Sequence, residues 1–181
     1  MTSPEHQSFT LGIEEEYFLV NLRTRALVSE PPRQLLDDCK GLLGEHVSAE
    51  FQRSQIEVAT PICTSMSEAR AQLFRLRNVL ATAASRYGLA PIAASTHPFT
   101  SWGTQRHTDM ARYNKIAHDL QAVGRRMVIS GMHVHVGIDD DEQRIAVMNH
   151  MRGFLPLLLL NIFTVLAGRG HRAEIVSHGD Q

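Results

Sequence analysis

Two segments of this chain place ionisable side chains at alternate positions within strand-like apolar runs. They are Gly12-Ile13-Glu14-Glu15-Glu16-Tyr17 and Gly131-Met132-His133-Val134-His135-Val136-Gly137. Because successive side chains of a strand point to opposite faces, Glu14 and Glu16 share one face, and His133 and His135 share a face of another strand. Carboxylates are costly to bury unless a cation compensates them. These segments therefore require a sheet with one polar face, and a divalent metal fits that face.

Composition indicates a globular chain with one sizeable core. Of its 181 residues, 43% are hydrophobic and 20% are charged, and the formal net charge is -1. Without a basic surplus, neither nucleic acid nor an anionic membrane is expected as a partner. Cys39 and Cys63 form no CxxC pair, so a reducing cytoplasm is the expected location. The most apolar stretch, residues 154–167, is interrupted by Pro156 and Asn161 and is too short for a membrane span.

The periodicity of apolar residues predicts strands and helices in alternation. Strands are expected over residues 9–20, 48–60, 89–95 and 126–138, with a short return strand at 26–28. Helices are expected over 33–43, from a capping box at Ser65 and Glu68 to Gly88, over 109–123, and from about 142 onward. This order indicates an α/β or α+β fold whose helices cover one face of a sheet. A doubly wound nucleotide fold is disfavoured, since the chain contains neither GxGxxG nor GxxxxGK[ST].

Glu14 and Glu16 are the first candidate metal ligands. Hard cations such as Mg²⁺ and Mn²⁺ choose carboxylate oxygens. The alternative is an ordinary solvated strand face, which suits a run of glutamates in isolation. Glu57, on the predicted second strand, is a weak candidate when taken alone.

His133 and His135 are the second pair of candidates. Two histidines on one strand face, between Gly131 and Gly137, are less usual than a single structural histidine, and the glycines allow a ligand or another backbone to approach closely. The pair equally fits a zinc hydrolase, in which a His-x-His strand supplies two nitrogen ligands.

Arg112 and Tyr113 are candidate contacts for a carboxylate or a phosphate. For each of them, an ordinary structural or surface role is the alternative.

Three of these segments together resemble the carboxylate–amine ligase family, also called the glutamate–cysteine ligase type 2 family. The matching segments are Leu11-Gly12-Ile13-Glu14-Glu15-Glu16-Tyr17, Gln55-Ile56-Glu57-Val58-Ala59-Thr60 and Gly131-Met132-His133-Val134-His135-Val136-Gly137. Their order and spacing match from Phe9 to about Leu160. The set of three is specific, whereas any single segment is not.

The resemblance implies an α+β, glutamine-synthetase-like fold, with a curved and mainly antiparallel sheet and helices on its outer face. It also implies a reaction in which ATP phosphorylates a substrate carboxylate and an amine attacks the acyl phosphate, with glutamate as the acid and cysteine or another amine as the nucleophile. ATP and Mg²⁺ (or Mn²⁺) are the implied cofactors. The implied metal ligands are Glu14, Glu16, Glu50, Glu57 and His133.

The same resemblance places His135 in the substrate or nucleotide pocket, beside the candidate contacts Arg112 and Tyr113. Small amino acids and ATP are the expected partners, with no nucleic acid and no membrane, and self-association stays open. The catalytic residues themselves are not identified.

The end of the sequence departs from the family pattern. Members show a segment like Ser-Ser-Pro-Phe-Trp-Gln-Gly after the apolar helix, and one choice of codons for residues 162–171 encodes that segment when shifted by one base. We therefore expect residues 1–160 to be the N-terminal half of a ligase catalytic domain and 161–181 to be an aberrant, frameshifted tail. This half of the catalytic domain alone is expected to have little or no ligase activity. A zinc-type hydrolase and a non-catalytic metal-binding fragment remain the alternatives.

Overall fold

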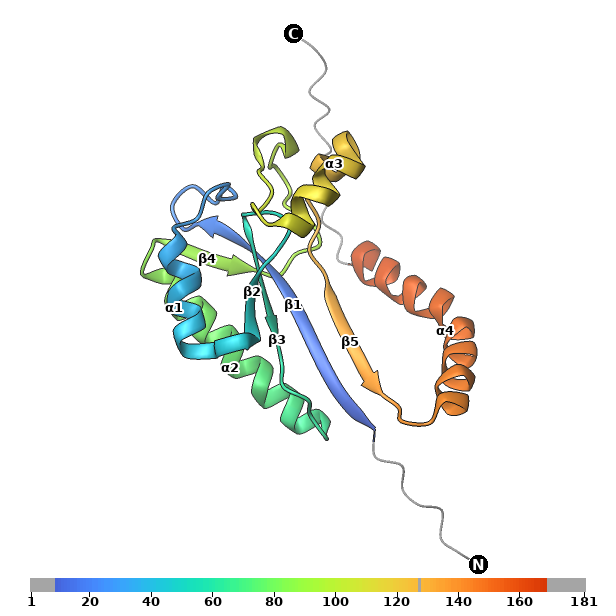
Figure 1. Cartoon of the computed structure of the whole chain (residues 1–181). Coiled ribbons are helices and arrows are strands. Elements are labelled where there is room, and N and C mark those ends of the chain that lie inside the picture. Colours follow the sequence, from blue (N-terminus) through green and yellow to red (C-terminus); the bar gives the residue numbers. More distant parts are fainter. Residues whose placement is uncertain (1–8, 127, 169–181) are drawn as a thin grey trace, which may run out of the picture. The chain divides into compact units, whose positions relative to one another are not determined.

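The computed structural model describes residues 9–126 and 128–168. The elements are β1 (Thr10–Asn21), α1 (Arg33–Leu43), the 3-10 turn η1 (Gly44–His46), β2 (Val47–Ala49), β3 (Gln55–Ala59), α2 (Met66–Ser85), β4 (Leu89–Ile92), the 3-10 turn η2 (Trp102–Thr104), α3 (Ala111–Arg126), β5 (Met132–Gly137) and α4 (Asp141–Gly168). The chain divides after Gly137 into two compact units. The first holds the sheet, and the second holds α4 (Figure 1).

β1 is the central strand of the sheet. One of its edges pairs with β3, while β5 and then β4 pair with successive halves of its other edge. β2 extends the sheet beyond β3. Every one of these strand pairs is antiparallel, which confirms the expected antiparallel sheet.

The two faces of β1 have different surroundings. Tyr17 and Leu19 point to the face that α1 and α2 cover, where they join a buried cluster with Leu35, Cys39, Leu76 and Leu80. Figure 1 shows these two helices side by side against the sheet. Glu14, Glu16 and Phe18 alternate with those residues and so point to the opposite face. The expected layer of helices on one face is therefore confirmed.

Local capping explains where two helices begin. The Ser65 Oγ atom accepts a hydrogen bond of 3.2 Å from the backbone N–H of Glu68, as predicted for α2. The Glu68 carboxylate accepts from the backbone N–H of Thr64 rather than from that of Ser65. At the start of α4, Asp140 Oδ1 accepts from the N–H of Gln143 at 2.7 Å. Among the described residues, no helix combines the length and apolar character needed to cross a bilayer.

The prediction of a single strand over 48–60 is wrong. The chain reverses between Ala49 and Gln55, and the two short strands on either side pair with each other, Val47 opposite Val58. A turn hydrogen bond from the N–H of Gln55 to the carbonyl of Gln52 closes the reversal.

Three other strands are shorter than predicted. β4 ends at Ile92 rather than at 95. β5 begins at Met132 rather than near 126, because the backbone N–H of Ser130 bonds to Ser95 and not to a sheet neighbour. The return strand at 26–28 is reduced to one bridge, between Val20 and Leu27.

Candidate metal centre

The register of β1 assembles the candidate ligands. Glu16 lies opposite Glu57 of β3, and Glu14 lies opposite His133 of β5. His135 lies opposite Gly12, one pair further along. Because directly opposed residues share a face, all of these side chains lie on the face that α1 and α2 leave open.

Three carboxylates form the first group of possible ligands, namely Glu16, Glu50 and Glu57. Their nearest oxygens all lie within 4.8 Å of one another. Glu50 comes from the reversal between β2 and β3, which is what brings it beside Glu57. Ser48 Oγ donates a hydrogen bond of 3.2 Å to the Glu57 carboxylate and orients it.

The electrostatics of this group favour a bound cation. Burial raises the pKa of Glu57, and the negative charge of Glu50 raises it further, with smaller contributions from Glu14 and Glu16. The hydrogen bond from Ser48 acts in the opposite direction. A cation at this position would remove the repulsion that disfavours the ionised form of Glu57.

Glu14, His133 and His135 form a second group. The Glu14 Oε2 atom lies 3.0 Å from His133 Nδ1 and 3.2 Å from His135 Nε2. Both imidazoles are more than half exposed, at 58% and 60%. Hydrogen bonds from His135 and from His133 lower the pKa of Glu14.

The donor sets suit divalent metals. Three carboxylates match the preference of Mg²⁺ or Mn²⁺ for oxygen, and two imidazoles with one carboxylate match metals that accept nitrogen. All five predicted ligands thus lie on one face, in two groups: Glu14 and His133 in one, and Glu16, Glu50 and Glu57 in the other. That they hold a metal stays a prediction. His135 lies with Glu14 and His133. Its expected place in the substrate or nucleotide pocket stays a prediction.

A cavity of about 340 Å³ adjoins the carboxylate group, and Glu16, Glu50, Tyr113 and His133 are among the residues that line it. Tyr113 is buried, and its hydroxyl donates to the carbonyl of Ala49 at 3.2 Å. That bond fixes the ring as part of the cavity wall.

Arg112 is exposed, whereas Tyr113 is buried. Of the two, Arg112 is therefore the better candidate for contact with a ligand. Its guanidinium lies 4.3 Å from the centre of the Tyr113 ring and donates to the Tyr113 hydroxyl. The hydrogen bond to Tyr113 raises the pKa of Arg112, and the charges of Glu50 and Glu57 add to that effect. Arg112 therefore acts electrostatically on the carboxylate group.

A charged network on the helix-covered face was not predicted. Glu15 is buried and receives hydrogen bonds from Tyr17 and from Arg77 of α2. Burial alone would raise the pKa of Glu15, but the bonds from Arg77 and Tyr17 lower it overall. The sequence carried one signal for this network: alternation puts the middle glutamate beside Ile13 and Tyr17, where a buried carboxylate requires a cation.

One of the two flanking glycines has a packing role. A Cβ atom added to Gly137 would lie 2.1 Å from Thr10 Oγ1, so the Thr10 side chain on the neighbouring strand would have to move to admit it. A Cβ added to Gly131 would meet nothing within 4 Å. The backbone N–H of Gly131 donates to the Glu16 carboxylate at 3.0 Å instead.

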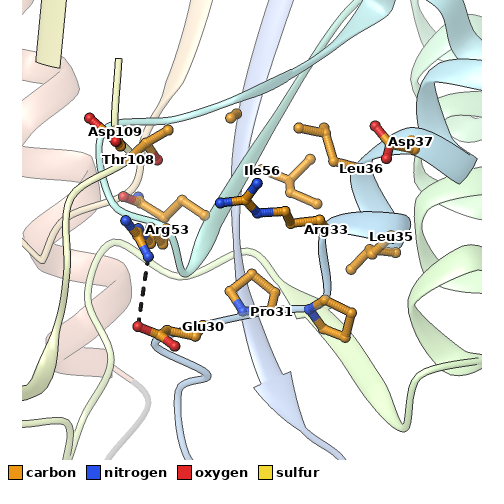
Figure 2. Close-up of a pocket in the computed structure, with 13 residues that line it drawn as sticks. Glu30, Pro31, Arg33, Leu35, Leu36, Asp37, Arg53, Ile56, Thr108 and Asp109 are labelled. Carbon is orange, nitrogen blue, oxygen red and sulfur yellow. Dashed lines mark ion pairs between the residues drawn. The ribbon is translucent and has the colours of Figure 1, made fainter. Parts of the chain in front are cut away.

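A larger cavity of about 830 Å³ lies at the start of α1 (Figure 2). Glu30 and Arg53 face each other across its rim, with their nearest charged atoms 3.7 Å apart. Arg33, Asp37 and Asp109 also line it. None of its lining residues is a predicted ligand, although Gln55 lines both this cavity and the one beside the carboxylate group.

The family resemblance is confirmed by comparison with known proteins. Residues 10–160 match the family described as glutamate–cysteine ligase family 2 (GCS2), and the chain belongs to this family. A relative from Rhodospirillum rubrum, named "Putative glutamate–cysteine ligase 2", is 51% identical over 156 residues, which are 84% of this chain and 40% of that protein. A protein of the same name from Paracoccus denitrificans is 47% identical over 155 residues, or 86% of this chain and 41% of that protein. The chain thus spans about two fifths of the length of these relatives.

Solved structures confirm the fold. The glutamate–cysteine ligase of Francisella tularensis, solved in complex with AMP, aligns with a TM-score of 0.59 at 16% identity, over 80% of this chain and 30% of that chain. A bifunctional glutathione synthetase from Pasteurella multocida aligns with a TM-score of 0.60, also at 16% identity, over 75% of this chain and 18% of its own. At this level of identity the likeness concerns the fold alone.

Proposed function

We propose that this chain carries the metal-binding part of an ATP-dependent carboxylate–amine ligase, with glutamate as the acid and cysteine or another amine as the nucleophile. The observation that carries the proposal is the gathering of Glu14, Glu16, Glu50, Glu57 and His133 on one open sheet face, in a member of glutamate–cysteine ligase family 2. ATP and Mg²⁺ or Mn²⁺ would be the cofactors.

Positioning and charge neutralisation dominate phosphoryl transfer. Bound divalent cations would offset the negative charge of the phosphate oxygens. Glu16, Glu50 and Glu57 would hold one cation, with Ser48 orienting Glu57. Arg112 would contribute positive charge toward a phosphate or carboxylate in the adjoining cavity.

Amide formation would follow in two steps. The substrate carboxylate attacks the terminal phosphate of ATP, which gives an acyl phosphate and ADP. The amine nitrogen then attacks the acyl carbon, and inorganic phosphate leaves with the electrons of the broken C–O bond. The amine must be deprotonated for this attack.

Metal-dependent nucleotide binding tests the first part of the proposal. The purified chain is titrated with ATP by calorimetry, in Mg²⁺ and again in a chelator. We expect heat of binding only with the metal present, and at least about tenfold weaker binding for Glu57→Gln. Glu45→Gln, an exposed glutamate in η1, is the matched control and should bind as the wild type does. Equal binding with and without metal contradicts the proposal.

Substrate dependence tests the second part. ADP release is measured with ATP and glutamate, with and without cysteine, and then with other amines. Release that requires both an acid and an amine supports a ligase, whereas release independent of both points to simple hydrolysis of ATP.

We propose further that residues 161–181 are read in a shifted frame. The support for this proposal is the codon argument from the sequence. Residues 169–181 lie outside the part that the structure describes. Sequencing of the encoding DNA tests this idea, which fails if no single-base shift restores the family segment.

A metal hydrolase is the second candidate, and the grouping of Glu14 with His133 and His135 favours it. It requires nitrogen-bound metal for activity and no ATP. Hydrolysis of ester or amide substrates in the absence of nucleotide would support it over the ligase.

A further inference from the structure

We infer that the cavity of about 830 Å³ at the start of α1 binds a short peptide through its two charged ends. Arg33 and Arg53 would take the peptide carboxylate, and Asp37 would take its ammonium group. The inference goes beyond the proposed function, because it involves none of the candidate metal ligands and requires no ligase reaction.

The size and the apolar walls of this cavity suit an organic ligand. Pockets for small organic molecules measure about 300–1,000 Å³ and combine mainly apolar walls with a few placed polar groups. Leu35 and Ile56 line the cavity and are buried, with Pro31 and Leu36 beside them. An inorganic ion would leave most of this volume to water, whereas peptide side chains would cover the apolar walls.

Arg53 is held in place at one side of the cavity. Its Nε atom donates to the carbonyl of His107 at 3.0 Å, and its Nη1 atom lies 3.7 Å from Glu30 Oε1. The Nε atom of Arg106 lies 3.4 Å from the same Glu30 oxygen. Glu30 would therefore keep a cationic neighbour while Arg53 binds a carboxylate. Because the Arg53 side chain is already fixed, binding would cost it little conformational entropy.

Arg33 and Asp37 supply opposite charges from one helix. They are four residues apart in α1 and so lie on the same face of it. The ion pairs found within residues 9–126 and 128–168 include neither of them. Figure 2 shows the Arg33 side chain extending from α1 toward the side of the cavity that holds Arg53. One cation and one anion are thus available to a ligand.

The balance of charge favours a zwitterion over a simple anion. The lining contains two guanidinium groups, Arg33 and Arg53, and three carboxylates, Glu30, Asp37 and Asp109. An anion attracted by the arginines would be repelled by Asp37 and Asp109, because like charges at short range raise the free energy of the complex. A peptide with a free ammonium group would pair with these carboxylates instead.

Blocked peptides test the inference. The purified chain is titrated with the dipeptide alanyl-leucine by calorimetry at pH 7, in a chelator and without ATP. The same titration is made with N-acetyl-alanyl-leucine, which lacks the ammonium group, and with alanyl-leucine amide, which lacks the carboxylate. We expect saturable binding of the free dipeptide and at least about fivefold weaker binding of each blocked form.

Substitutions assign each charge of the peptide to its partner. Arg33→Gln should weaken binding of alanyl-leucine at least about fivefold but leave binding of the amide unchanged, since the amide has no carboxylate to lose. Asp37→Asn should weaken binding of the free dipeptide and leave that of the N-acetyl form unchanged. Lys40→Gln, in the last turn of α1, is the matched control and should bind as the wild type does. Circular dichroism checks the folding of every variant.

Glu57→Gln separates this cavity from the carboxylate group, and it should bind the dipeptide as the wild type does. Three results would overturn the inference: no binding of alanyl-leucine, equal affinity for the free and both blocked forms, or wild-type affinity in both Arg33→Gln and Asp37→Asn. Equal binding of the N-acetyl form and the free dipeptide would show a simple anion site and would also overturn it. The proposed ligase function fails on a different result, namely ATP binding that does not depend on metal.

Discussion

At the scale of single residues, the surroundings of Glu57 disfavour the ionised form of its carboxylate. Its pKa is raised by burial and by Glu50, so its ionised form is disfavoured in the folded chain. The resulting stability is present below the ordinary glutamate pKa of about 4.3 and is lost as the pH rises through the higher folded pKa. Without metal, the ionised form of Glu57 therefore destabilises the fold at neutral pH.

We accordingly expect Glu57→Gln to raise the melting temperature at pH 7 in a chelator by about 1 to 3 °C. Glutamine keeps a hydrogen-bond acceptor for Ser48 and removes one negative charge. Differential scanning calorimetry at pH 4 and pH 7 gives the comparison, and the gain should vanish at pH 4. A lower melting temperature at pH 7 would show that the repulsion is unimportant.

At the scale of elements, the ion pair between Glu15 and Arg77 ties β1 to α2. Glu15 has a side-chain exposure of only 7%, while Arg77 is 54% exposed. Replacement of Arg77 by Met would leave a buried carboxylate without its cation, at a cost of about 1 to 3 kcal/mol after allowance for the exposure of the arginine. Urea unfolding measures this loss. Arg75→Met, an exposed arginine of the same helix, is the control and should change stability by less than about 0.5 kcal/mol.

The same ion pair gives a prediction for acid pH. The pKa of Glu15 is lowered in the folded chain, so its contribution is present above the ordinary glutamate pKa and is lost as the pH falls through the folded value. Glu15→Gln should remove this part of the acid sensitivity, so that its stability falls less steeply than that of the wild type below about pH 4.3. Parallel curves for the two proteins would contradict this account.

At the scale of the whole molecule, the sheet face that carries the candidate ligands is open in the part of the chain that the structure describes. The chain spans about two fifths of its relatives, and the two histidines of the site are more than half exposed. Catalysis of phosphoryl transfer benefits from exclusion of water. We expect amide formation at least about a hundredfold slower than that of a full-length relative, measured by product formation under the same conditions. Comparable rates would refute this expectation.

The alternation of side chains allowed much of the site to be predicted. It placed Glu14 and Glu16 on one face and Tyr17 and Leu19 on the other, because the period of a strand is fixed by its backbone. The division into two ligand groups was not predictable, since it depends on which residue of β5 lies opposite Glu14. Pairing across more than a hundred residues leaves no local trace in the sequence.

The reversal between β2 and β3 was also missed, for a different reason. Residues 50–54 contain no glycine, proline, asparagine or aspartate, so the strongest signals of a turn are absent. This reversal places Glu50 beside Glu57. Glu50 therefore lies in a turn, and not in the continuous strand that was predicted. The family resemblance, rather than the local pattern, identified Glu50 as a candidate.

The long separation between the two sides of the second group has a consequence for folding kinetics. Glu14 and His133 are 119 residues apart in the sequence, yet they meet across one strand pair. Contacts between residues so far apart in the sequence form slowly, because the entropy of closing the long loop is lost before the contact stabilises the fold. The hairpin of β2 and β3 can form early, so the carboxylate group should mature before the histidine group. During refolding, the contacts within the carboxylate group should therefore return ahead of those between Glu14 and His133.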